Sequence, residues 1–153
     1  RLLRAYVTRA PRDPRGWRSL VSARLDAVTR GYDPLTGSPP AALVAIEPDV
    51  RQLIEHADDP SSLNGIGWYW ALRQKPNVGL NFAIRAVRAE PSCGACWDTV
   101  GLLYFQAGKI EQALEAQERA ASIYAERVPP EVTARLRRFR AALRRRPTGG
   151  SAR

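Results

Sequence analysis

The sequence predicts an all-α protein: a right-handed solenoid of helical hairpins closed by a C-terminal capping helix. Two patterns favour this fold class, an internal repeat with a period of 34 residues and a C-terminal segment with apolar residues at helical spacing. The composition agrees, since 153 residues with 44% apolar and 25% charged side chains suit one globular unit. The longest aliphatic run, residues 41–46, is far shorter than the roughly 20 residues of a spanning helix.

The repeat consists of small and large residues at matching positions. The second copy contains Trp97, Val100, Gly101, Tyr104, Gly108, Ala113, Ala120 and Ala125. The first copy, 34 residues earlier, contains Leu63, Ile66, Gly67, Trp70, Gly79, Ala86 and Pro91. Small residues let two antiparallel helices approach closely, and the large residues fill the space beside them. Each copy is therefore expected to form a helical hairpin.

This spacing resembles the tetratricopeptide repeat over residues 60–127, which implies two such repeats. Three positions depart from the family pattern. Gly79 is unfavourable inside a helix by about 1 kcal/mol. Ala83 and Gln117 occupy a slot where the family usually has an aromatic residue. The chain is interpreted as the C-terminal repeat module of a longer bacterial-type protein.

The N-terminal flank, residues 1–59, is expected to form a degenerate repeat, a connecting loop and a short helix. Trp17 stands six residues after Pro11, the same spacing as between Pro91 and Trp97. Glycines and prolines between residues 31 and 40 predict the loop, and the short helix is placed at residues 48–56.

The C-terminal flank, residues 128–146, is predicted to be a basic helix that caps the solenoid. Its apolar stripe consists of Val132, Leu136, Phe139 and Leu143. Residues 147–153 are expected to be a disordered tail.

The resemblance also implies where a partner binds. In this family the first helix of each hairpin lines a concave groove, and the slots facing it are occupied here by Asn64, Trp68, Leu72, Asp98, Leu102, Phe105 and Gln106. Trp68 is the first candidate anchor for a peptide or helix of a protein partner. The alternative is that the helix at residues 48–57 covers Trp68 and buries it as core. Asp98 has the wrong charge for the family's carboxylate-clamp subclass, which disfavours recognition of an acidic C-terminal tail.

Cys93 and Cys96 lie at the expected start of a helix, and three interpretations stay open. They are inert packing residues, a structural disulfide, or a redox or shared metal site. The redox interpretation lacks a surrounding βαβ pattern, and no histidine follows Cys96, which excludes covalent haem attachment. An oxidised pair would indicate a periplasmic or extracytoplasmic location, and a reduced pair a cytoplasmic one.

The formal charge of +9 is unevenly distributed. Residues 31–134 carry eight basic and thirteen acidic side chains, whereas the capping helix carries seven arginines: Arg135, Arg137, Arg138, Arg140, Arg144, Arg145 and Arg146. This basic face is interpreted mainly as the solvated side of the cap. An anionic membrane surface is an alternative partner, while nucleic acid is disfavoured because stacking aromatics are lacking on that face.

No residues in a catalytic arrangement are found. His56 is the only histidine, and it lies among carboxylates without a neighbouring nucleophile. No cofactor or metal site and no enzymatic activity are predicted, and any membrane or catalytic domain is expected upstream of this chain.

Overall fold

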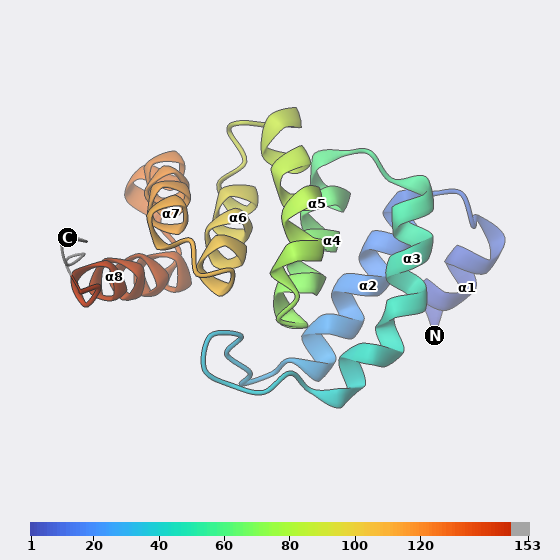
Figure 1. Ribbon diagram of the computed structural model, residues 1–153. Coiled ribbons are helices and arrows are strands. Elements are labelled where there is room, and N and C mark those ends of the chain that lie inside the picture. Colours follow the sequence, from blue (N-terminus) through green and yellow to red (C-terminus); the bar gives the residue numbers. More distant parts are fainter. Residues whose placement is uncertain (148–153) are drawn as a thin grey trace.

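The computed structural model describes residues 1–147. All regular secondary structure in this part of the chain is helical (Figure 1). In chain order the helices are α1 (Leu2–Arg9), α2 (Pro14–Val28), the 3-10 helix η1 (Ala41–Ile46), α3 (Glu47–His56), α4 (Pro60–Leu72), α5 (Pro76–Ala89), α6 (Gly94–Gln106), α7 (Ile110–Tyr124), the 3-10 helix η2 (Ala125–Arg127) and α8 (Pro130–Arg144). The predicted all-α hairpin solenoid is confirmed. Of the tail predicted at residues 147–153, residues 148–153 lie outside the described residues.

Local sequence signals explain where the helices begin. Asp13 and Asp59 each precede a proline, and each carboxylate accepts a backbone N–H of the first turn, from Arg15 at 3.0 Å and from Ser62 at 3.0 Å. A proline at the first helical position costs no hydrogen bond, because that N–H has no partner within the helix. The two Asp-Pro pairs therefore set the starts of α2 and α4.

The two repeats form the hairpins α4–α5 and α6–α7, in which small residues bring the helices together. A methyl group on Gly67 would lie 3.1 Å from Cβ of Ala83, and one on Gly101 would lie 2.5 Å from Oε1 of Gln117. The slot that departs from the family pattern thus faces the glycine of the opposite helix. It holds Ala83 in one hairpin and the fully buried Gln117 in the other.

The N-terminal part and the second repeat share a hydrogen bond between a tryptophan and a preceding proline. The indole N–H of Trp17 donates to the Pro11 carbonyl at 2.7 Å, and that of Trp97 donates to the Pro91 carbonyl at 2.9 Å. Helix α2 packs against η1 and α3, and α1 packs against α2. The helix predicted at residues 48–56 begins one residue earlier, and η1 before it was not predicted.

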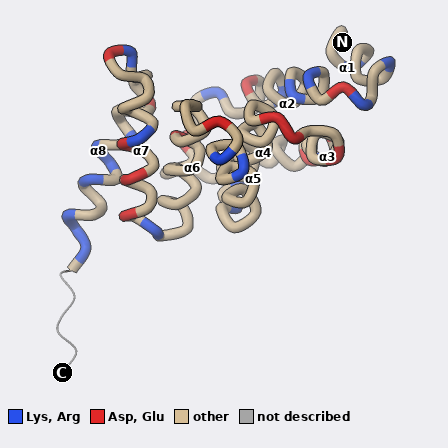
Figure 2. The backbone as a smooth tube through the Cα atoms, turned by 90° about the horizontal axis from the view of Figure 1, so that it is seen from above, with Lys and Arg blue, Asp and Glu red and all other residues tan. Residues whose placement is uncertain are grey.

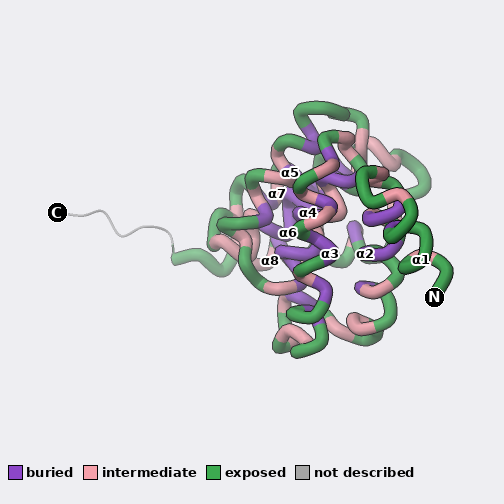
Figure 3. Tube along the Cα trace, turned by 90° about the vertical axis from the view of Figure 1, so that its right-hand side faces the viewer, coloured by how far each residue is buried: buried purple, intermediate pink, exposed green. Residues whose placement is uncertain are grey.

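Two adjoining hydrophobic clusters make up the core, and the buried residues follow the facing sides of the helices (Figure 3). One cluster joins α1, α2, η1, α3 and α4, and the other joins α4 to α7. Trp68 on α4 packs against both. Helix α8 covers the end of the array: Phe139 is fully buried and stacks on Phe105 of α6 with ring centroids 4.4 Å apart.

Candidate functional site: a groove along the first helices

The candidate site is a groove formed by two adjoining hollows. The larger has a volume of about 660 Å³ and is lined by α4, α6, α8 and the segment that follows α2. The smaller, about 550 Å³, lies mainly between α2 and α4. Asn64 and Trp68 line both hollows, so α4 supplies the residues at their junction.

Trp68 lies half-buried at this junction. Its ring packs against the two core clusters, while the guanidinium carbon of Arg135 lies 5.9 Å from the ring centroid. Trp68 is not buried completely by α3, as the alternative predicted, because its side chain still lines both hollows. Trp68 therefore combines a fixed position with a surface that a partner can reach.

The other predicted groove residues divide into two groups. Leu72 and Asp98 line the larger hollow but are mostly buried. Leu102, Phe105 and Gln106 line neither hollow, which corrects their predicted placement in the open groove. Leu102 is fully buried in the core, and the ring of Phe105 lies against α8.

Gln106 contacts the backbone of other segments. Its side-chain amide donates to the carbonyl of Ala71 at 2.9 Å and to that of Pro34 at 3.3 Å. The groove-facing position of Gln106 is therefore already in contact with the loop around Pro34, which is distant in sequence.

Asp98 is likewise bound within the chain. Its carboxylate accepts hydrogen bonds from Arg135 Nε at 2.8 Å, Arg135 Nη2 at 2.6 Å and Gln117 Nε2 at 2.6 Å. The prediction that the Asp98 slot is free to face a partner is corrected, because its carboxylate joins α6 to α7 and α8. The polar groove residue without such a partner is Asn64, whose Oδ1 is buried and accepts no hydrogen bond from the described residues.

Comparison with solved structures agrees with this fold. The chain is similar to the Sgt2 TPR domain from Aspergillus fumigatus, with a TM-score of 0.71 and 14% identity over 92% of this chain and 86% of that one. It is also similar to the first TPR domain of human RPAP3, with a TM-score of 0.66 and 17% identity over 86% of this chain and 95% of that one. The chain has the fold of a tetratricopeptide-repeat (TPR) domain. No protein-family model and no curated protein matches it.

One edge of this TPR-like groove is formed by loop residues that were not predicted to face it. Asp33, Pro34 and Leu35, in the loop between α2 and η1, line the larger hollow. Burial raises the pKa of Asp33, but hydrogen bonds from the Leu35 N–H, the Thr36 hydroxyl and Arg138 outweigh it, so the pKa lies below its ordinary value. The Asp33 carboxylate is therefore a persistent negative charge at the edge of the groove.

The basic residues of α8 lie beside the acidic residues of α7 (Figure 2), and several of them form ion pairs with other parts of the chain. Four of its seven predicted arginines have acidic partners: Arg135 with Asp98, Arg138 with Asp33, Arg140 with Glu118, and Arg146 with Glu111. Within the described residues, Arg137, Arg144 and Arg145 have no acidic partner within 4.0 Å. These pairs favour a role in docking α8, and binding of an anionic membrane surface stays a prediction.

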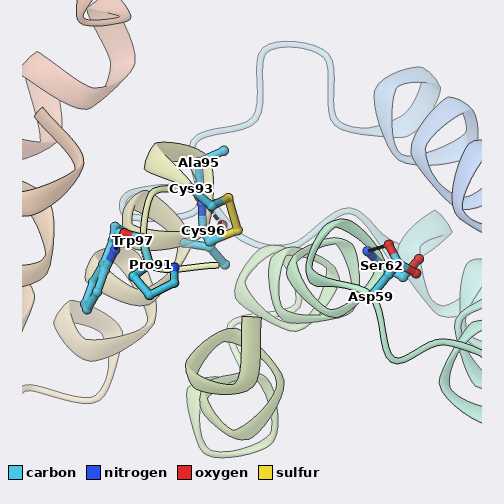
Figure 4. Close-up of a disulfide and its surroundings, with 8 residues drawn as sticks. Asp59, Ser62, Pro91, Cys93, Ala95, Cys96 and Trp97 are labelled. Atoms are coloured by element: carbon cyan, nitrogen blue, oxygen red, sulfur yellow. Dashed lines mark hydrogen bonds between the residues drawn. A yellow bond between two sulfur atoms is a disulfide. The ribbon is translucent and has the colours of Figure 1, made fainter. Parts of the chain in front are cut away.

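The two cysteines form a disulfide at the start of α6 (Figure 4). Their α-carbons are 5.2 Å apart, and Cys93 Sγ also accepts the backbone N–H of Cys96 at 3.1 Å. Cys96 is fully buried, whereas Cys93 is half-buried. Of the three interpretations of the pair, the structure contains the disulfide, and exchange with other thiols stays a prediction.

No helix within residues 1–147 is long and apolar enough to cross a membrane. No group of three or more His, Cys, Asp or Glu side chains in that range could hold a metal ion.

Proposed function

We propose that the protein is a protein-interaction module that binds a peptide or helix of a partner in the groove along α2, α4 and α6. The observation that carries the proposal is the position of Trp68. It is a large aromatic residue, accessible from both hollows and held in place by the core beneath it. Such rigid aromatic residues dominate the free energy of binding at many interfaces. The proposal includes no catalytic step.

The chemistry of the groove indicates how a segment would be held. An apolar side chain of the partner would pack on the Trp68 ring, opposite the Arg135 guanidinium. The Asn64 side chain lines both hollows, and its amide would form a hydrogen bond with a polar group of the partner. A peptide can supply both groups, one from a side chain and one from a main-chain N–H.

The proposal is tested by selecting peptides from a displayed library with the immobilised protein and measuring their affinity for two variants. Trp68→Ala should weaken binding by about 2 kcal/mol or more, with a smaller change in melting temperature. Trp97→Ala is the control, because the Trp97 side chain packs beside Pro91, away from both hollows. It should lower stability while the folded fraction keeps its affinity. Equal affinity of the selected peptides for wild type and Trp68→Ala would contradict the proposal.

A further inference from the structure

The segment Tyr32–Gly37, called the strap below, lies against the C-terminal ends of α4 and α6 and is linked to α8 (Figure 1). We propose that the strap, which forms one edge of the open hollow, fills the end of the groove where a segment of a partner would otherwise lie. The inferred partner is a short turn that presents the same groups: a carboxylate, a proline and an aliphatic side chain. This inference rests on the proposed function, because it names the partner chemistry for one part of the same groove.

The strap occupies slots that the repeat register assigns to a partner. The Tyr32 hydroxyl donates to the Leu72 carbonyl at 2.9 Å, and Gln106 donates to the Pro34 carbonyl at 3.3 Å. Leu72 and Gln106 stand 34 residues apart, at equivalent positions on α4 and α6. The strap is therefore held by matching positions of the two repeats, as a bound peptide would be.

The helices hold the strap largely through its main chain. Gln74, just after α4, donates its side-chain amide to the Pro34 carbonyl at 3.1 Å and to the Gly37 carbonyl at 2.7 Å. Pro34 itself is buried, and Leu35 packs against the second core cluster. Contacts to carbonyl groups do not depend on the identity of a side chain, so another segment with the same turn can make them.

The backbone of Gln74 provides a second, independent observation. Gln74 has a φ of +53°, in the left-handed region that favours glycine, and the equivalent position after α6 is Gly108, with a φ of +76°. Non-glycine residues in this region carry strain and are concentrated at functional sites. Glutamine here supplies the amide that holds the strap, which glycine could not do.

The carboxylate of the strap has two roles. Asp33 accepts hydrogen bonds from the Leu35 N–H at 2.9 Å and the Thr36 hydroxyl at 3.0 Å, which fixes the turn. The same carboxylate pairs with Arg138 of α8 at 3.2 Å. Arg138 and Asp33 both line the larger hollow, so the pair links the strap to the opposite wall of the groove.

The proposal is tested by supplying the strap as a separate peptide. The host is the full chain with Asp33→Ser, Pro34→Gly and Leu35→Ser, and the probe is a labelled, acetylated and amidated peptide with the sequence of residues 31–38. The host should bind the probe. Wild type should bind it at least about tenfold more weakly, because its own strap is present at millimolar effective concentration.

A matched pair of variants then isolates the carboxylate contact. Adding Arg138→Gln to the host should weaken probe binding about two- to fivefold, as expected for a partly exposed ion pair. Adding Arg137→Gln should leave the affinity unchanged, because Arg137 has no acidic partner among the described residues. A folded host that binds the probe no better than a scrambled peptide would overturn the proposal, and so would equal effects of the two arginine variants.

A single substitution keeps the proposal testable if the host does not fold. Gln74→Gly removes the amide that holds the strap but suits the backbone of that position. Hydrogen exchange of the Leu35 and Gly37 amides should become at least about fivefold faster, with exchange in α4 not accelerated. Unchanged exchange in the strap would overturn the proposal. Peptides that depend on Trp68 would still bind in that case, so the proposed function is tested separately.

Discussion

Asp98 shows how much one buried charge does in this protein. It accepts three hydrogen bonds from Arg135 and Gln117, so one carboxylate joins α6, α7 and α8. The side chains of Asp98 and Arg135 are only 12% and 16% exposed. Removing one member of such a pair leaves an uncompensated charge in a poorly solvated place. Asp98 therefore has a large effect on stability although it lies at the edge of the groove.

Asp98→Asn should lower the free energy of unfolding by about 3 kcal/mol, because Arg135 would lose its counter-charge. Urea denaturation followed by circular dichroism measures this change. The matched control is Glu118→Gln, which removes an ion pair whose two side chains are each about half exposed. That substitution should change stability by less than about 1 kcal/mol. Equal effects of the two substitutions would show that Asp98 is not a structural residue.

At the scale of one element, α6 contributes to both the core and the groove. Ala95, Asp98 and Thr99 line the larger hollow, and Gly94 at the start of the helix lies under the ring of Tyr124. The disulfide between Cys93 and Cys96 closes this first turn. It restrains the turn that contains Ala95, directly before Asp98 and Thr99.

Reduction of the disulfide with dithiothreitol should lower the free energy of unfolding by up to about 2 kcal/mol, the loop entropy expected for a loop this short. Helical content should be retained, because the packing of α6 does not depend on the sulfur bridge alone. Thermal melting with and without reductant measures the effect, and a variant with both cysteines replaced by serine should not respond to reductant. Rapid exchange with a small disulfide substrate, without a change in stability, would instead favour the redox interpretation.

At the scale of the whole molecule, carboxylates at several helix ends are stabilised in their charged form. Hydrogen bonds from Arg15 and Tyr6 lower the pKa of Asp13 to about 2. Hydrogen bonds from Arg51 and Arg73 lower the pKa of Glu47 despite partial burial.

The pKa of Asp59 is also lowered. Burial raises its pKa, but hydrogen bonds from Ser62 and the charge of Arg18 outweigh that effect, so the pKa lies below its ordinary value. Together with Asp33, these carboxylates hold fewer protons in the folded than in the unfolded state in acidic solution.

Stability should therefore be constant between about pH 7 and 5 and fall as the pH drops below about 4 toward 2. The sign follows from the lowered pKa values: the contribution is complete above the unfolded pKa of about 4 and is lost as the folded carboxylates take up protons. Urea denaturation at pH 7, 5 and 3 measures it. A free energy of unfolding that increases on acidification would contradict this explanation.

The hairpins were predictable from the sequence because close packing of neighbouring helices needs small residues at fixed intervals. Gly67 and Gly101 are such residues, 34 positions apart. The equal spacing from proline to Trp17 and to Trp97 indicates the same architecture. These contacts join residues that are near one another in the chain, so their spacing is visible without a structure. Comparing Gln74 with Gly108 in the same register would also have identified Gln74 as unusual.

The sequence by itself determined the all-α solenoid, the register of its two repeats and the helix face on which Trp68 lies. Only the tertiary structure decided which groove slots stay open. Asp98 is bound by Arg135, 37 residues away, and Gln106 by Pro34, 72 residues away. Helical periodicity reports the face on which a residue lies, but a distant segment that covers that face leaves no trace in the local pattern. The strap and α8 are such segments, and they leave Asn64 and Trp68 at the centre of the groove.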